Sequence, residues 1–177
     1  MAGGIQKGTV ATDAVAKKLD TQCRQMRDYI ADCICKEIPG LVMKKKIPRD
    51  LIPGGVGACQ PDGGAWFYKG ELIAVFEGKK QDTKGNAVER WFKNHYICRL
   101  INPNVSYVTF AVGEAACEDG KIGEILAVAH QDGFNTYVHG GNSCFLKKNG
   151  FSDEEVYNTM WQVLIERTDW VRATRRS

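Results

Sequence analysis

The sequence has no apolar run that approaches the roughly 20 residues needed to cross a bilayer. Its first residues, Met-Ala-Gly-Gly-Ile-Gln-Lys, also lack the apolar core of a signal peptide. Both absences predict a cytoplasmic protein without a membrane partner.

Histidine is scarce, with three in the chain, and none of the seven cysteines forms a C-x-x-C pair. The odd number of cysteines and their mostly apolar neighbours are typical of reduced core thiols and argue against a disulfide scaffold. The spacing of Cys33 and Cys35 relative to the histidines does not match a zinc finger. Internal repeats and low-complexity tracts are also absent.

The remaining composition is that of a folded domain. The chain has 177 residues, of which 44% are apolar and 25% charged, close to the average for globular proteins. At this length we expect one domain spanning residues 1–177.

The net charge is only +3, but bases gather in short windows. Five bases against two acids lie between Lys79 and Lys93, an excess equal to the net charge of the whole chain. Two further clusters comprise Lys44, Lys45, Lys46 and Arg49, and Arg172, Arg175 and Arg176. Such patches can follow a phosphate backbone, although a charge run is more often a solvated face.

Apolar periodicity predicts the first elements. Apolar residues recur at spacings of three and four from Val15 to Ile38, which indicates an amphipathic helix with Thr12 as N-cap and Pro39-Gly40 as its end. The Gly- and Pro-rich residues 47–64 predict a connecting loop. Strands at 65–68 and 72–77, joined by a turn at 69–70, predict a hairpin whose second strand is central because it is apolar at consecutive positions.

The following segments predict a crossover. A helix is expected from Asn86, as N-cap, to Leu100, and a third strand from Val105 to Val112, so that part of the sheet is parallel. Ser152 and Glu155 form a capping box that opens a last helix. The fold class is therefore α/β, with a mixed β-sheet flanked by α-helices.

Charged residues end the central strand. Period-two alternation predicts that Ile73, Val75, Glu77 and Lys79 share one face, which changes from apolar to charged. For an isolated Glu-x-Lys, a salt-bridged strand end is the more common explanation. However, Asp62 begins the first strand of the hairpin, so its carboxylate and that of Glu77 are expected to converge.

Such a site suits a hard cation. Two carboxylates and the carbonyl of Gly78 are ligands that Mg²⁺ prefers, and Mg²⁺ takes further oxygens from phosphate. The ammonium of Lys79 would lie beside the metal-bound water, where it can stabilise developing negative charge.

The arrangement Pro61-Asp62 followed by Glu77-Gly78-Lys79 resembles the PD-(D/E)xK nuclease superfamily. The stretch that follows, Lys80-Gln81 and then Gly85-Asn86-Ala87-Val88-Glu89-Arg90, is similar to the base-reading region of type II restriction endonucleases of the EcoRI and MunI branch. The strand Tyr107-Val108-Thr109-Phe110 follows in the same order. The resemblance covers about residues 58 to 114 and implies a restriction-endonuclease-like core.

By this resemblance Asp62, Glu77 and Lys79 are catalytic, and Mg²⁺ is held by Asp62, Glu77 and Gly78. Asn86 and Arg90 would bind the adenines of an AATT core, and asparagine can indeed bind adenine with two hydrogen bonds. A simple N-cap is the alternative role for Asn86. The full set of expected DNA-binding residues is Lys80, Gln81, Lys84, Gly85, Asn86, Ala87, Glu89 and Arg90.

The expected activity is Mg²⁺-dependent cleavage of double-stranded DNA at a palindrome by a homodimer, because two-fold protein symmetry matches two-fold DNA symmetry. The resemblance implies 5′-phosphates, 5′ overhangs and a cognate adenine methyltransferase that protects host DNA. Gly78 departs from the family pattern, which has an apolar residue there, and only six residues separate Lys79 from Asn86. The alternatives are a DNA repair or junction nuclease of the same fold and a non-cleaving DNA-binding module.

Overall fold

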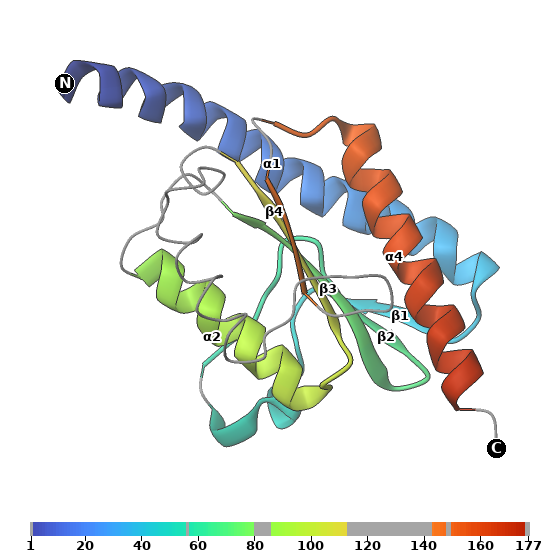
Figure 1. Ribbon diagram of the computed structural model, residues 1–177. Coiled ribbons are helices and arrows are strands. Elements are labelled where there is room, and N and C mark those ends of the chain that lie inside the picture. The colour runs from blue at the N-terminus through green and yellow to red at the C-terminus, as the bar shows by residue number, and fades with distance from the viewer. Residues whose placement is uncertain (1, 56, 80–85, 113–142, 148–149, 176–177) are drawn as a thin grey trace.

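The computed structural model describes residues 2–55, 57–79, 86–112, 143–147 and 150–175 (Figure 1). The helices are α1 (Ala2–Glu37), α2 (Asn86–Ile101) and α4 (Asp153–Thr174). The strands are β1 (Leu41–Lys44), β2 (Ala65–Tyr68), β3 (Glu71–Lys79), β4 (Ser106–Ala111) and β5 (Ser143–Lys147). Two short 3-10 segments, Arg49–Leu51 and Pro53–Gly55, lie between β1 and β2.

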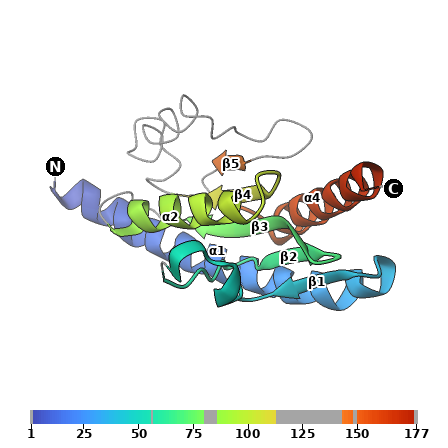
Figure 2. The ribbon, with the colours of Figure 1, turned by 90° about the horizontal axis from the view of Figure 1, so that it is seen from below.

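The strands form one mixed sheet in the order β1-β2-β3-β4-β5 (Figure 2). β1 pairs antiparallel with β2, and β2 with β3. β3 and β4 are parallel, as are β4 and β5. The mixed α/β class, the central position of β3 and the crossover through α2 are therefore confirmed.

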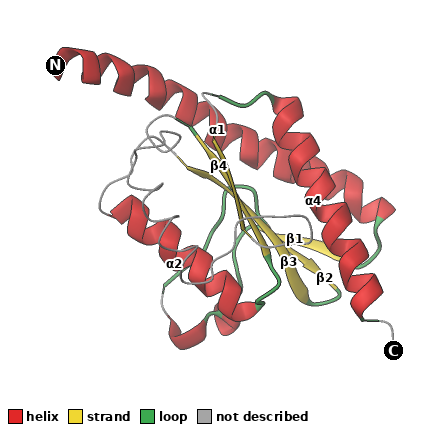
Figure 3. Ribbon diagram, in the orientation of Figure 1, coloured by secondary structure: helices red, strands yellow, loops and turns green. Residues whose placement is uncertain are grey.

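Helices cover both faces of the sheet, with α1 and α4 on one side and α2 on the other (Figures 1 and 3). The core divides accordingly. One cluster joins the apolar residues of α1 and α4 to Trp66, Phe76 and Phe110, and the second joins Trp91 and Cys98 of α2 to other strand residues. Among the described residues, no helix has the length and apolar character to span a membrane.

The β2–β3 hairpin closes through a two-residue turn. Tyr68 pairs with Glu71, and both Lys69 (φ 50°) and Gly70 (φ 83°) have positive φ. This is the conformation of a tight hairpin turn whose twist matches the flanking strands. The predicted hairpin is confirmed.

A β-bulge corrects the predicted face of β3. Trp66 pairs with Ala74 and Phe67 with Leu72, so Ile73 is the extra residue. Ile73 consequently packs with Ala74 and Phe76 in the α1/α4 core cluster, whereas Val75 lies in the α2 cluster. The expectation that Ile73 shares the face of Val75 was wrong, because simple alternation fails across a bulge.

The helix predictions hold except at two starts, because Asn86, the predicted N-cap, is already the first residue of α2. α1 ends at Glu37 before Pro39-Gly40 as expected, but it begins at Ala2, so Thr12 lies inside the helix and is not its N-cap. Residues 2–12 contain no proline that would end a helix, so the helix continues through Thr12 despite its preference for a cap position. The capping box of α4 is confirmed by the reciprocal bonds of Ser152 and Glu155.

Candidate active site at the end of β3

Backbone hydrogen bonds bring Asp62 beside Glu77. Gly63 N donates to Phe76 O at 2.8 Å, and Phe76 N donates to Gly64 O at 3.3 Å. These bonds extend the β2–β3 ladder to the C-terminal end of β3, where Asp62 and Glu77 are the next residues outward. The expected juxtaposition of the two residues is therefore present in the backbone.

This close approach requires glycine. A Cβ on Gly63 would lie 2.5 Å from the Cβ of Phe76 and 3.0 Å from its carbonyl oxygen. Gly64 has a φ of +83°, and a Cβ there would lie 3.1 Å from the side chain of Arg27. The two glycines after Asp62 thus allow the chain to pass directly over β3.

Arg27 of α1 supports this turn from the other side. Its Nη1 donates to Asp62 O at 3.3 Å, and its Nε donates to Asp28 Oδ1 at 2.8 Å. The Arg27 side chain is only 8% exposed, so the paired carboxylate compensates a buried charge. Arg27 therefore fixes the backbone position of Asp62.

A third acidic group, which the sequence pattern does not predict, lies at this end of the sheet. Asp20 of α1 is buried, and its Oδ1 lies 3.4 Å from where a Cβ on Gly78 would stand. Arg24 Nη2 lies 4.0 Å from Asp20 Oδ2 and 3.7 Å from Asp62 Oδ1. Asp20 and Arg24 fall on the polar positions of an ordinary amphipathic helix, so only the packing of α1 against β3 identifies them.

Gly78 allows that packing. A Cβ at this position would lie 3.3 Å from Leu19 Cγ, which is tighter than normal van der Waals contact. The nuclease superfamily that the sequence resembles usually has an apolar residue at this position. Its side chain would overlap with α1 here. The departure at Gly78 thus accompanies the close approach of α1 to β3.

Glu77 is held from the α2 side of the sheet. The hydroxyl of Tyr107 on β4 donates a hydrogen bond to Glu77 Oε2. Burial, then the Glu77 carboxylate, raises the pKa of Tyr107 well above its usual value. The hydroxyl therefore stays protonated and remains a donor to Glu77.

An aromatic stack lies beneath Tyr107. The ring of His95 stacks on Tyr107 with 4.8 Å between centroids and lies 5.2 Å from Trp91. Trp91 Nε1 donates to Thr109 Oγ1 at 2.9 Å, which ties α2 to β4. Burial, and then the charge of Arg99, lowers the pKa of His95 to about 3. His95 is consequently neutral and serves as a packing residue.

The carboxylates create a negative field at this end of the sheet. The buried thiol of Cys23 on α1 has a raised pKa, caused first by burial and then by the charges of Asp62, Asp20 and Glu77. Three acidic groups therefore act on one point of α1. Such a field favours a cation.

The remaining predicted residues divide between described and undescribed parts of the chain. Lys79 belongs to β3 and pairs with Ala111, while its side chain lies outside the described set. Arg90 of α2 is exposed. Asn86 is the first residue of α2, which agrees with a helix start, and the side chains of Asn86, Ala87 and Glu89 are outside the described set. Lys80, Gln81, Lys84 and Gly85 lie outside the described residues altogether.

The basic clusters differ in their surroundings. Lys44, Lys45 and Lys46 are exposed. In contrast, Arg175 Nη2 lies 2.7 Å from Glu71 Oε1, and Arg172 Nε donates to Tyr68 Oη at 2.9 Å. Arg172 and Arg175 therefore hold α4 against the turn of the hairpin, at the end of β3 opposite the hydrogen bond between Gly63 and Phe76. Figure 1 shows α4 beside this hairpin.

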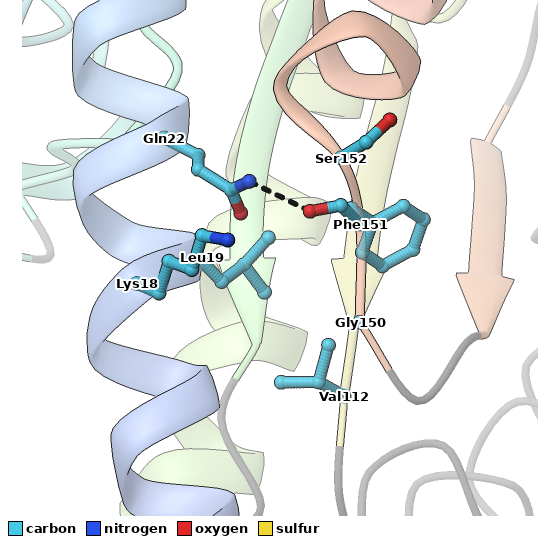
Figure 4. A pocket seen from close by; sticks show the side chains of 7 residues that line it. All are labelled: Lys18, Leu19, Gln22, Val112, Gly150, Phe151 and Ser152. Atoms are coloured by element: carbon cyan, nitrogen blue, oxygen red, sulfur yellow. Dashed lines mark hydrogen bonds between the residues drawn. The ribbon is translucent and has the colours of Figure 1, made fainter.

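A cavity of about 280 Å³ opens near the candidate site on the α1/α4 side (Figure 4). It lies between α1, the residue after β4 and the start of α4, where Gln22 Nε2 donates to Phe151 O at 2.6 Å. Its lining residues are Lys18, Leu19, Gln22, Val112, Gly150, Phe151 and Ser152. None of the predicted catalytic residues lines it.

In the part of the chain that the structure describes, no three His, Cys, Asp or Glu side chains form a group able to hold a metal ion. The expected Mg²⁺ ligands are two carboxylates and one carbonyl, and they supply the hard oxygen donors that this ion prefers. The Asp62 side chain is 26% exposed and already attracts the cation of Arg24. The donor set therefore fits Mg²⁺ chemically.

No protein-family model and no curated protein sequence matches the chain.

Proposed function

We propose that the chain is a Mg²⁺-dependent type II restriction endonuclease that cleaves double-stranded DNA at a palindrome with an AATT core. The observation that carries the proposal is the backbone ladder that sets Asp62 beside Glu77 at the end of β3. A mixed sheet with helices on both faces is compatible with a restriction-endonuclease-like core.

The chain's own residues have distinct tasks in this proposal. Asp62, Glu77 and the carbonyl of Gly78 would hold Mg²⁺, which when bound activates a water and stabilises the leaving oxygen. Tyr107 keeps the Glu77 carboxylate in place through its hydroxyl. The Lys79 ammonium stabilises the negative charge that develops on the phosphate.

Base recognition is assigned to the start of α2. Asn86 and Arg90 are four residues apart and share one side of a helix, so both can reach adjacent adenines in the major groove. The small side chain of Ala87 permits close approach, and Glu89 orients an arginine. The other proposed DNA contacts are Lys80, Gln81, Lys84 and Gly85.

A palindromic site implies two copies of the chain. In a homodimer, each subunit cuts one strand, and the two-fold axis of the protein coincides with that of the DNA. The products would carry 5′-phosphates and 5′ overhangs. A cognate adenine methyltransferase would protect the host DNA from cleavage.

The direct test is digestion of a sequenced plasmid with Mg²⁺, followed by mapping of the ends. Asp62→Asn, Glu77→Gln and Lys79→Met should each lower the cleavage rate by at least about 100-fold, because each removes a charge at the reaction centre. Asp169→Asn, which removes an exposed acid near the other end of the sheet, is the matched control and should cleave normally. Circular dichroism should confirm that all variants are folded.

The other outcomes discriminate among alternatives. Ends without a shared sequence would favour a repair or junction nuclease, and specific binding without cleavage would favour a DNA-binding module. Cleavage near the wild-type rate by the Glu77 or Lys79 variant would refute the assigned site.

A further inference from the structure

Arg24 places a positive charge on the carboxylate that is expected to bind the metal. Its Nη2 lies 3.7 Å from Asp62 Oδ1 and 4.0 Å from Asp20 Oδ2. The Arg24 side chain is 51% exposed, whereas those of Asp62 and Asp20 are 26% and 11% exposed. A half-exposed guanidinium thus neutralises two more buried acids.

We propose that Arg24 is the resident counter-ion of Asp62, that a divalent cation displaces it, and that the released guanidinium then binds a DNA phosphate. This inference rests on the proposed function, because it assigns the metal to Asp62. It adds a residue of α1 to a site that otherwise consists of the hairpin and the start of α2.

A comparison of two arginines on α1 supports this exchange. Arg27, less than one turn away, is buried and tied both to Asp28 and to the backbone of Asp62, so it cannot leave. Arg24 reaches Asp62 through a side-chain ion pair near the limit of direct contact. Ion pairs this long, in which one partner is half exposed to solvent, are weaker than close pairs and exchange more readily with other charges.

Electrostatics predicts how Arg24 changes the affinity of the protein for metal and for DNA. A divalent cation on Asp62 and the guanidinium a few ångströms away would repel each other, so Arg24 opposes metal binding while it stays. Once displaced, the guanidinium can pair with a phosphate through two parallel N–H groups, which a lysine cannot do. Arg24 would therefore lower metal affinity in the free protein and raise DNA affinity in the metal-loaded protein.

The first test measures Ca²⁺ binding to the full chain without DNA by isothermal titration calorimetry. Arg24→Met should bind Ca²⁺ about five-fold more tightly than wild type, because a competing positive charge is gone. Lys36→Met is the matched control, since this exposed lysine of α1 lies twelve residues from Arg24, about 18 Å along the helix. Its Ca²⁺ affinity should equal that of wild type.

The second test measures binding of an AATT duplex in Ca²⁺ over a range of salt concentrations. Arg24→Met should bind several-fold more weakly, with a salt dependence shallower by about one phosphate contact. Lys36→Met should again match wild type.

Equal or weaker Ca²⁺ binding by Arg24→Met would overturn the displacement, and unchanged DNA affinity would overturn the phosphate contact. If wild type cleaves the plasmid while either result is found, this inference fails and the proposed nuclease stands. If wild type binds neither Ca²⁺ nor DNA, both fail together.

Discussion

Gly63 shows how a single missing side chain shapes the candidate site. The N–H of Gly63 donates a hydrogen bond to Phe76 O, which holds the chain against β3. A Cβ atom on Gly63 would overlap with Phe76. Because Phe76 is fully buried in the α1/α4 core cluster, it has no space to withdraw. The placement of Asp62 therefore depends on the absence of a methyl group at the next residue.

We predict that Gly63→Ala destabilises the protein by about 1 to 3 kcal/mol, because an added methyl group would overpack a rigid contact. Cleavage should fall as well, since the Asp62 backbone would be pushed from Glu77. Urea denaturation and plasmid cleavage measure the two effects. Gly55→Ala separates backbone strain from steric overlap: no atom lies within 4 Å of its Cβ position, so its cost reflects only an alanine held at a φ of +65°. Unchanged stability of Gly63→Ala would contradict the steric argument.

A second prediction at this scale concerns pH. The pKa of His95 is lowered to about 3 in the folded protein, below its ordinary value of 6.5, by burial and by Arg99. The unfolded chain therefore takes up a proton before the folded one as the pH falls. The stability that neutral His95 provides is complete above about pH 6.5 and is lost progressively toward pH 3.

His95→Phe keeps a ring between Trp91 and Tyr107 and removes the titration. Below pH 6.5, the unfolding free energy of wild type should fall relative to this variant by up to about 1.4 kcal/mol per pH unit. Urea unfolding at several pH values between 7.5 and 4.5 measures the difference. Parallel curves for the two proteins would show that His95 does not titrate in this way.

At the scale of elements, α4 depends on a local signal for its first turn and on the core for the rest. Ser152 Oγ accepts from Glu155 N at 3.1 Å, and Glu155 Oε1 accepts from Ser152 N at 3.1 Å. Beyond this turn, Val156, Met160 and Leu164 are fully buried against the sheet and α1. The cap fixes where the helix starts, and the buried face fixes where it lies.

Ser152→Ala should destabilise the protein by about 1 kcal/mol, because it leaves an N-terminal amide of α4 without its acceptor. Ser152→Asp should retain most of the stability, since it keeps an acceptor oxygen and suits the helix dipole. Thermal or urea unfolding of the three proteins tests this. Equal losses for both variants would mean that the cap bond is not the cause.

The elements predicted from sequence are those with a strong local signal. The hairpin turn at Lys69-Gly70, the helix start at Asn86 and the box at Ser152 each follow from backbone preferences of a few residues. β1 was not predicted, because Leu41–Lys44 is short and its sequence also reads as part of a basic segment. β5 was not predicted either, and its parallel pairing with β4 joins residues distant along the chain. The bulge at Ile73 arises from pairing between strands and has no signature in apolar alternation.

The same distinction holds for the candidate site. Asp62 and Glu77 were predicted to meet because they belong to one hairpin, and its antiparallel pairing dictates which residues face each other. Asp20 and Arg24 reach that point from α1 through long-range packing. A lone acid and base on an amphipathic helix carry no sequence signal for such a contact, so these residues could only be found in the structure.

At the scale of the whole molecule, charge is distributed unevenly between the two ends of the sheet. At one end, Arg172 and Arg175 contact Tyr68 and Glu71, so their charges serve the contact between α4 and the hairpin. At the other end, Asp62 lies beside Glu77 near the end of β3, and the exposed Arg90 lies in the first turns of α2. We therefore expect DNA to approach the end of the molecule that holds Asp62 and Glu77.

If the proposed endonuclease function is correct, the length of the chain between β3 and α2 limits how much DNA sequence can be read. Six residues, 80–85, join Lys79 of β3 to Asn86 of α2. Fully extended they span only about 20 Å, at 3.3 to 3.6 Å per residue, and they must leave the sheet and return to the helix. Little chain remains to lie along an outer base pair, whereas Asn86 and Arg90 at the helix start can reach inner adenines. We predict a minimal site of AATT, alone or with degenerate flanks. Sequencing the ends from a complete genomic digest tests this, and one fixed base on each side of AATT at every cut would disprove it.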